Sequence, residues 1–163
     1  AHQQAGIDVT RLVAEALLDA RDVLSGPVFV QSFSSEALLR LNDDYAGAWP
    51  LVQLLDNAEA ARAAAEPSRL TEIADYATGI GLPYTTLIRR GANGTGVEAT
   101  GLADAIAAAG LIAHPYTLRR DAAPEGAVDY FDALRFLIHE LRVDGIFCDF
   151  PDDGVRIRDY SAA

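Results

Sequence analysis

Short apolar runs alternate with longer segments of mixed polarity along this chain. Each run is bounded by Gly, Pro, Asp or Asn, which is typical of strands that are buried on both faces of a parallel sheet. The runs cover residues 28–30, 51–55, a weak run at 79–81, 111–113 and 145–147. We therefore predict five short strands.

The segments between these runs show helical spacing. Residues 8–24 carry apolar side chains on one helical face, and Ser34 or Ser35 is suited to cap a helix that contains Leu38, Leu39 and Leu41. Further helices are predicted over 57–75 with a break at Pro67, over 99–109 with Gly110 beyond the end, and over 128–142. Strands that alternate with helices predict an α/β fold, a parallel sheet covered by helices, as one domain over 1–163.

Length and charge narrow the possible partners. A chain of 163 residues is long enough to bury a sizeable core, and its net charge of −11 argues against nucleic acid and against an anionic membrane surface. No apolar run reaches the length of a membrane span, so we expect none. The start of the sequence lacks the charged and apolar regions of a signal peptide, so we expect none in this chain.

The absence of two residue types is also informative. All thirteen basic residues are Arg, which excludes Schiff-base and phosphate-loop lysines. The sequence contains no Met, so we expect a processed chain or a fragment. Cys148 is the single cysteine, which excludes an intrachain disulfide; its apolar surroundings favour a buried structural thiol.

Polar side chains follow the predicted strands at their carboxyl ends, where parallel α/β proteins build their active sites. Arg89-Arg90 and Arg119-Arg120 fall on the same side and suggest an anionic ligand, although solvated loop charges are the alternative. The polar groups at the strand ends are Gln31-Ser32-Phe33, Gln53, residues 81–84, His114-Pro115-Tyr116-Thr117 and Asp149-Phe150-Pro151-Asp152.

Several of these candidates have two interpretations. His114 is placed for acid–base chemistry or substrate binding, or it satisfies a loop carbonyl. Asp149 could bind a metal or orient a base, but capping of the next turn is favoured, and Asp152-Asp153-Gly154 indicates a turn. Gln31 and Gln53 need hydrogen-bond partners, from neighbouring side chains or from a ligand.

The remaining polar candidates favour structural roles. Asn93-Gly94-Thr95-Gly96 follows no strand and predicts a flexible loop, and His139 is interpreted as structural, while His2 lies in the terminal tail. Ser32 has no evident base partner, and no HxxE or HxH metal spacing occurs. The residues alone therefore indicate a parallel α/β protein with a polar, anion-tolerant face and an incomplete set of catalytic groups.

Five motifs resemble the bacterial glycerophosphodiester phosphodiesterases of the periplasmic type. They are VFVQSF, PLVQLLDN, YATGIGLPY, IAHPYTLR and VDGIFCDFPD, in the same order as in that family. The resemblance implies a (β/α)8 barrel that hydrolyses glycerophosphodiesters to glycerol 3-phosphate and an alcohol with Ca²⁺ or Mg²⁺. It also implies a periplasmic or secreted location.

The family's catalytic motifs on its first three strands are absent from this sequence, namely His-Arg-Gly, Glu-x-Asp, His-Asp and Pro-Glu-x-Lys. The resemblance therefore implies a partial barrel of about five parallel strands, strands 4–8, without catalytic histidines or metal ligands. A full barrel of about 250 residues has about 31 per unit, so 163 residues correspond to about five units. The substrate-binding candidates that it leaves are Gln31, Phe33, His114, Tyr116, Arg119 and Asp149.

Two hypotheses follow from this comparison. In the first, the chain is the C-terminal part of a phosphodiesterase, inactive alone, whose partner is the missing N-terminal half. In the second, it is a non-catalytic half-barrel that associates with itself or with another chain through its open sheet edges. Another phosphate-handling barrel fragment is a weaker third alternative.

Overall fold

The computed structural model describes residues 7–45 and 47–160 and contains a parallel sheet at its centre. The sheet has the order β1-β2-β3-β6 and pairs Gln31 with Val52, Gln53 with Ile80, and Gly81 with His114. Its strands are β1 (Val30–Ser32), β2 (Leu51–Leu54), β3 (Gly79–Pro83) and β6 (Ile112–Tyr116). The prediction of an α/β fold with parallel strands is confirmed.

Helices connect these strands as the sequence pattern predicts. Ser34 and Asn57 cap α2 and α3 by accepting hydrogen bonds from the backbone N–H groups of Ala37 and Ala60, at 3.2 and 2.9 Å. Pro67 opens α4, because a helix tolerates proline in its first turn. The helices are α1 (Val9–Ala20), α2 (Ser35–Asp44), α3 (Ala58–Ala64), α4 (Pro67–Ala74), α5 (Leu102–Ala108), α6 (Tyr130–Arg135) with a π-helical turn (Phe136–Glu140), and α7 (Pro151–Asp159).

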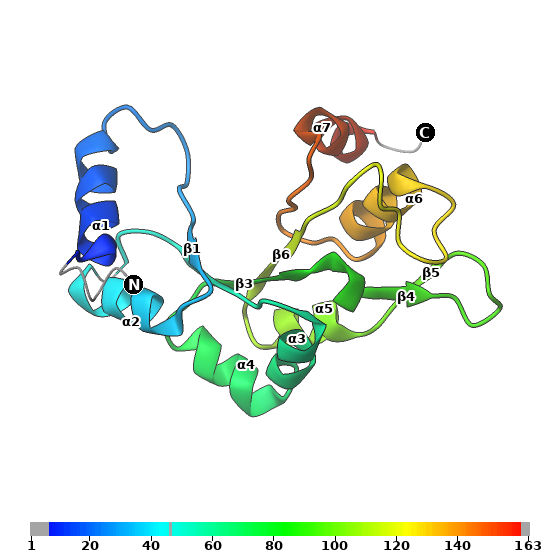
Figure 1. Cartoon of the computed structure of the whole chain (residues 1–163), viewed down its shortest axis with the longest axis horizontal. Helices are drawn as coiled ribbons and strands as arrows, with labels where there is room; N and C mark the ends of the chain where they lie inside the picture. The colour runs from blue at the N-terminus through cyan, green and yellow to red at the C-terminus, as the bar shows by residue number, and fades with distance from the viewer. Residues whose placement is uncertain (1–6, 46, 161–163) are drawn as a thin grey trace.

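The two faces of the sheet differ because successive strand residues point to opposite sides. Leu51, Ile80, Leu82 and Ala113 belong to the hydrophobic core that the helices share. The opposite side, here called the inner face, carries the alternate strand residues, among them Gln31, Phe33, Val52, Leu54, Gly79, Gly81, Ile112, His114 and Tyr116. Figure 1 shows α3, α4 and α5 together on one side of the sheet, with α1 at the left-hand end of the molecule and α7 at the top, away from those three helices.

The fifth predicted strand, 145–147, is not a regular strand, so the sheet has four strands rather than five. Gly145 and Phe147 do donate backbone hydrogen bonds to Ala113 and Pro115 of β6, at 3.3 and 2.9 Å. Pro115 has no N–H with which to donate back, so the reciprocal bond of a parallel ladder is lost. A single parallel bridge between Leu118 and Cys148 continues the alignment.

Two further elements correct the sequence-based interpretation. Residues 93–96 were predicted as a flexible loop that follows no strand. They instead lie in the turn of an antiparallel hairpin between β4 (Ile88–Arg90) and β5 (Val97–Ala99). Asp152-Asp153-Gly154 lies in the first turns of α7, not in a separate turn. Acidic residues are common both in turns and at helix N-termini, so Asp152 and Asp153 are compatible with a turn or with the start of a helix. Pro151 in the first turn favours the helix.

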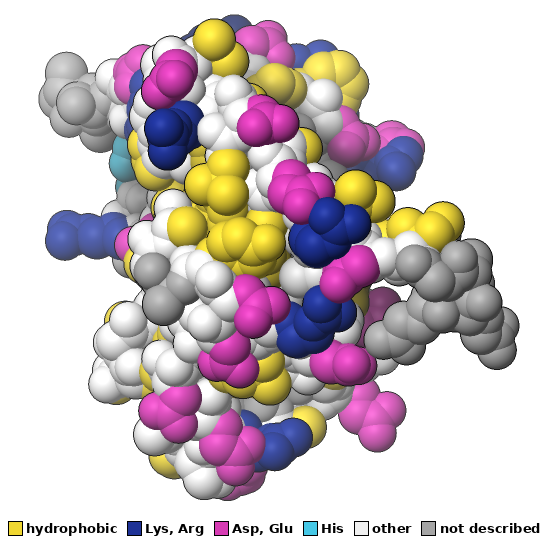
Figure 2. Space-filling view, turned by 90° about the vertical axis from the view of Figure 1, so that its left-hand side faces the viewer, with side chains coloured by type: hydrophobic (Ala, Val, Ile, Leu, Met, Phe, Trp, Pro, Cys, Tyr) yellow, Lys and Arg dark blue, Asp and Glu magenta, His cyan; other side chains and the backbone are white. Residues whose placement is uncertain are grey.

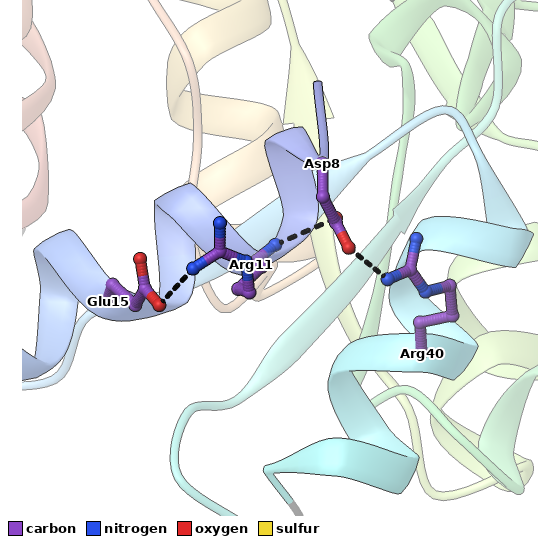
Figure 3. A network of polar contacts seen from close by, with 4 residues as sticks. All are labelled: Asp8, Arg11, Glu15 and Arg40. Carbon is purple, nitrogen blue, oxygen red and sulfur yellow. Dashed lines mark hydrogen bonds and ion pairs between the residues drawn. The ribbon is translucent and has the colours of Figure 1, made fainter. Parts of the chain in front are cut away.

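A polar network joins the first two helices (Figure 3). Asp8 caps α1 by accepting a hydrogen bond from the Arg11 N–H at 3.1 Å, and it accepts another from the Arg40 guanidinium of α2 at 2.6 Å. The Arg40 hydrogen bond, followed by the backbone bond from Arg11, holds the pKa of Asp8 below its usual value. Among the described residues, no helix is long and apolar enough to cross a membrane.

Candidate functional site

Aromatic side chains gather on the inner face of the sheet. The His114 ring makes T-shaped contacts with Phe29 and Phe147, with ring centroids 4.9 and 6.5 Å away, and Phe33 and Tyr116 make another at 6.3 Å. Gly145 makes room for this stack, because a Cβ atom there would lie 2.7 Å from the His114 ring. A glycine is therefore required where the last segment passes His114.

A small pocket of about 180 Å³ opens at the carboxyl end of this face. Three of the predicted site residues reach it: Gln31 from β1, Phe33 from the position just after β1, and Tyr116 from β6. Its lining consists of Gln31, Phe33, Leu54, Tyr116, Thr117 and Phe147. We call this the aromatic pocket.

The Tyr116 side chain is fixed by a contact across the sheet. Its hydroxyl donates a hydrogen bond to the carbonyl oxygen of Leu55, which follows β2. Burial, and then the negative charge of Asp56, raise the pKa of the Tyr116 phenol above its usual value. The hydroxyl therefore stays protonated at neutral pH, while the ring faces the aromatic pocket.

His114 does not line the aromatic pocket and is only 8% exposed. Burial lowers the pKa of its imidazole, and the opposing effect of the Asp144 carboxylate is smaller. Asp144 itself accepts a hydrogen bond from the Ala113 N–H at 2.9 Å, which anchors it beside β6. An uncharged imidazole at neutral pH can exchange a proton with a substrate or bind it by hydrogen bonds.

The two strand glutamines have different surroundings. Gln53 is 5% exposed, and its amide donates toward the carbonyl oxygens of Ser32, Phe33 and Leu54 at 3.3, 3.2 and 2.9 Å and accepts from the Tyr76 hydroxyl at 2.8 Å. The protein therefore satisfies this amide on the helix side of the sheet. Gln31 is exposed in the aromatic pocket, and its side chain bonds to none of the described residues.

Arg119 and Asp149, both predicted at the carboxyl side of the strands, lie close together in the structure. The Arg119 guanidinium makes a two-point contact with Asp121 at 3.0 Å and lies 3.7 Å from Asp149. All three side chains are largely exposed. The pKa of Arg119 is raised, first by its hydrogen bond to Asp121, so it is a permanent cation at this rim.

The other three predicted cations do not join Arg119 in one anion-binding group. Arg89 and Arg90 lie on the hairpin and pair with Glu98 and Glu125 at 3.5 and 3.2 Å. Arg120 pairs with Asp153 at 2.7 Å, and its guanidinium lies 4.0 Å from the centre of the Phe150 ring. Because Asp153 is 1% exposed, this pair fixes the loop after β6 to α7.

The remaining sequence candidates have structural contacts. Cys148 is half-buried and its thiol donates to the Phe150 carbonyl at 3.3 Å. His139 contacts the Ile157 carbonyl through Nε2 at 2.8 Å, which agrees with a structural role. The Ser32 hydroxyl accepts a hydrogen bond from the Ser34 N–H at 3.0 Å, Asp152 is exposed at the start of α7, and His2 lies outside the described residues.

Leu54 and Phe147 were missed as pocket residues from the sequence, whereas Thr117 was already among the polar groups placed at the strand ends. The period-2 alternation of the strands could have identified Leu54 and Phe147, because they share a face with Gln31 and His114. Within residues 7–45 and 47–160, no group of three or more His, Cys, Asp or Glu side chains could hold a metal ion.

The comparisons with known proteins agree with this geometry. The model of the Glycerophosphoryl diester phosphodiesterase family matches residues 2–153. A glycerophosphodiester phosphodiesterase of Haemophilus influenzae is 32% identical over 91 residues, which cover 55% of this chain and 25% of that protein. One of Bacillus subtilis is 31% identical over 127 residues, which cover 78% of this chain and 35% of that protein. The chain thus spans a quarter to about a third of these curated relatives.

Proposed function

Because the chain belongs to the glycerophosphoryl diester phosphodiesterase family, we propose that it forms the C-terminal part of such an enzyme's (β/α)8 barrel. The intact enzyme hydrolyses glycerophosphodiesters to glycerol 3-phosphate and an alcohol. The observation that carries the proposal is the family match over residues 2–153, and the aromatic pocket at the carboxyl ends of parallel strands supports it. On this proposal the four strands and the segment 145–147 are strands 4–8.

The chain supplies the substrate-binding wall of the active site in this account. Gln31, Phe33 and Tyr116 line the pocket that receives the alcohol, and His114 lies two residues before Tyr116 in β6. Arg119 binds the phosphate from the rim. It is more than half exposed, so its ion pairs with Asp121 and Asp149 are weak and can be exchanged for a phosphate contact.

The divalent cation, Ca²⁺ or Mg²⁺, is held by carboxylates outside this chain in the proposed enzyme. This agrees with the family resemblance and with the lack of a converging donor group among the described residues. When bound, the cation supplies charge stabilisation at the phosphate. We place the intact enzyme in the periplasm or outside the cell.

A second candidate function is an assembly module that pairs with another copy or another chain. The outer edges of β1 and of segment 145–147 are open in the described structure, and Phe29, Phe33 and Phe147 are well exposed. Figure 2 shows hydrophobic side chains between charged ones on the side of the molecule that carries α1, where Val9, Leu12, Val13 and Leu18 are exposed. Open edges and apolar patches of this kind favour association.

Extension of the chain tests the proposed enzyme. Residues 7–160 would be expressed behind the N-terminal portion of the Bacillus subtilis relative, and hydrolysis of glycerophosphocholine would be measured with Ca²⁺ and with Mg²⁺. We expect metal-dependent release of glycerol 3-phosphate, which Arg119→Gln weakens mainly through a higher KM. A folded chimaera without any turnover would contradict the proposal and favour the assembly module.

A further inference from the structure

A second pocket, of about 430 Å³, lies between α3, α5 and the β4–β5 hairpin. Along the chain α3 precedes β3, and the hairpin and α5 follow it, and β3 lies between β2 and β6 in the sheet. Figure 1 shows α3 and α5 side by side on the same side of the sheet. The pocket is therefore away from both open edges, and all of its lining belongs to this chain. We call it the arginine pocket.

The arginine pocket gathers positive charge in an acidic chain. Its lining includes Arg62 from α3 and Arg89 from β4 but no Asp or Glu, although the net charge of the chain is −11. Arg62 is exposed and forms no ion pair with any carboxylate of the described residues. Arg89 pairs with Glu98 at 3.5 Å, and because both side chains are exposed this pair is weak. Two guanidinium groups are thus available to one anion.

Three threonines line the same pocket. The Thr86 hydroxyl donates a hydrogen bond to the Pro83 carbonyl, and the Thr100 hydroxyl donates one to the Thr86 carbonyl, both at 2.7 Å. These bonds join the loop before α5 to the turn after β3. Thr85 is exposed, and its hydroxyl bonds to no other described residue, so it can donate to a ligand. The pocket therefore has a fixed wall and a free neutral donor in addition to its cations.

Apart from Gly101, the rest of the lining is apolar. It consists of Ala65, Ile88, Leu102 and Ala105, of which Ile88 is only 4% exposed. Pockets of about 300–1,000 Å³ hold small organic molecules, and a bare phosphate ion would leave most of this volume empty. Apolar surface beside two cations therefore suits an anion that carries an organic group.

We infer that the arginine pocket binds a small phosphate monoester, with its phosphate on Arg62 and Arg89 and its organic group on the apolar part of the lining. Guanidinium groups form paired hydrogen bonds with phosphate oxygens, and two of them match the charge of one monoester dianion. The inference does not rest on the proposed function, because the arginine pocket shares no residue with the aromatic pocket and does not include Arg119.

An NMR titration of the 163-residue chain at low ionic strength tests this inference. Phenyl phosphate is the probe, inorganic phosphate lacks its organic group, and phenol lacks its charge. The backbone amide signals of Thr85, Thr100 and Gly101 report on the arginine pocket, and those of Thr117 and Asp121 report on the region of Arg119. We expect phenyl phosphate to shift the first group of signals and to bind about ten-fold tighter than inorganic phosphate, because its ring is partly buried.

Variants separate this site from a general attraction of anions to exposed arginines. Arg62→Gln should weaken the binding of phenyl phosphate about ten-fold, because it removes charged hydrogen bonds to the phosphate. Arg89→Gln should have the same effect, and it answers the question if circular dichroism shows that Arg62→Gln has not folded. Arg142→Gln is the matched control, because Arg142 also forms no ion pair with a described carboxylate but follows the π-helical turn, outside the pocket. It should leave the affinity unchanged.

Three results would overturn the inference. The first is an affinity for phenyl phosphate no higher than that for phenol or for inorganic phosphate. The second is a set of shifts confined to Thr117 and Asp121, which would assign the binding to the region of Arg119. The third is an unchanged affinity in folded Arg62→Gln, or an equal loss in Arg142→Gln, because either would show that the phosphate is not held at the arginine pocket.

Discussion

Replacement of Gln53 by alanine tests how the end of β1 is joined to β2. The buried amide has two N–H protons to share among the carbonyls of Ser32, Phe33 and Leu54, and its oxygen accepts one bond from Tyr76. Gln53→Ala therefore removes three effective hydrogen bonds. At about 1 kcal/mol for each, we expect a loss of about 3 kcal/mol in the free energy of unfolding.

Urea denaturation followed by circular dichroism measures this loss. With a slope of about 2 kcal/mol per molar urea, the midpoint of unfolding should fall by about 1.5 M. Gln31→Ala is the matched control, because it truncates an exposed glutamine that bonds to no described residue, and it should change stability by less than about 0.5 kcal/mol. Equal midpoints for the two variants would refute the role assigned to the Gln53 amide.

Three further predictions concern other parts of the fold. Gly145→Ala should lower the free energy of unfolding by about 1–3 kcal/mol in thermal denaturation, because its Cβ would lie 2.7 Å from the His114 ring. The control Gly154→Ala, whose Cβ would lie 3.5 Å from the Cys148 sulfur, should be neutral or stabilising, and a larger loss for Gly154→Ala than for Gly145→Ala would contradict the packing. The pKa of folded Asp8 is lowered, so its carboxylate stabilises the fold above pH 3.8, the ordinary pKa, and this effect is lost as the pH falls through the folded pKa. The Tm of Asp8→Asn should therefore lie below that of the unaltered chain at pH 7 and equal it in acid, whereas a difference that does not depend on pH would argue against the Arg40 contact. The pKa of folded His114 is lowered by burial, so stability should decrease as the pH falls from 6.5 through the folded value, and an NMR titration that gives a pKa of 6.5 or above would contradict its burial.

The sequence was sufficient to predict the elements whose signals are local. Apolar runs bounded by turn residues identified β1, β2, β3 and β6 within a few positions, and Ser34 and Asn57 begin their helices as capping residues do. The hairpin β4–β5 was missed because its strands are three residues long and partly exposed, without a hydrophobic alternation. The segment 145–147 was predicted as a strand because its own sequence is apolar and strand-like. It is not a regular strand because Pro115 of the adjacent β6 has no N–H, and that pairing is a tertiary contact which the segment's own sequence does not show.

The candidate site was predictable in part for the same reason. Polar and aromatic residues at strand ends identified Gln31, Phe33 and Tyr116, which the structure brings into one pocket. The pairing of Arg120 with Asp153 could not be predicted, because it depends on how α7 packs against the loop after β6. The sequence-based interpretation also left Gln53 and Gln31 undistinguished, although strand alternation places Gln53 on the face opposite to Leu54, and the two amides do point to opposite faces of the sheet.

We propose that this chain provides the substrate-binding wall of a phosphodiesterase and that the catalytic groups lie outside it. The most direct measurement is the turnover of glycerophosphocholine by the 163-residue chain alone, with Ca²⁺ and with Mg²⁺, at high protein concentration. We expect no release of glycerol 3-phosphate above a blank without protein. Clear metal-dependent turnover that co-purifies with the chain and is lost in Arg119→Gln would contradict it.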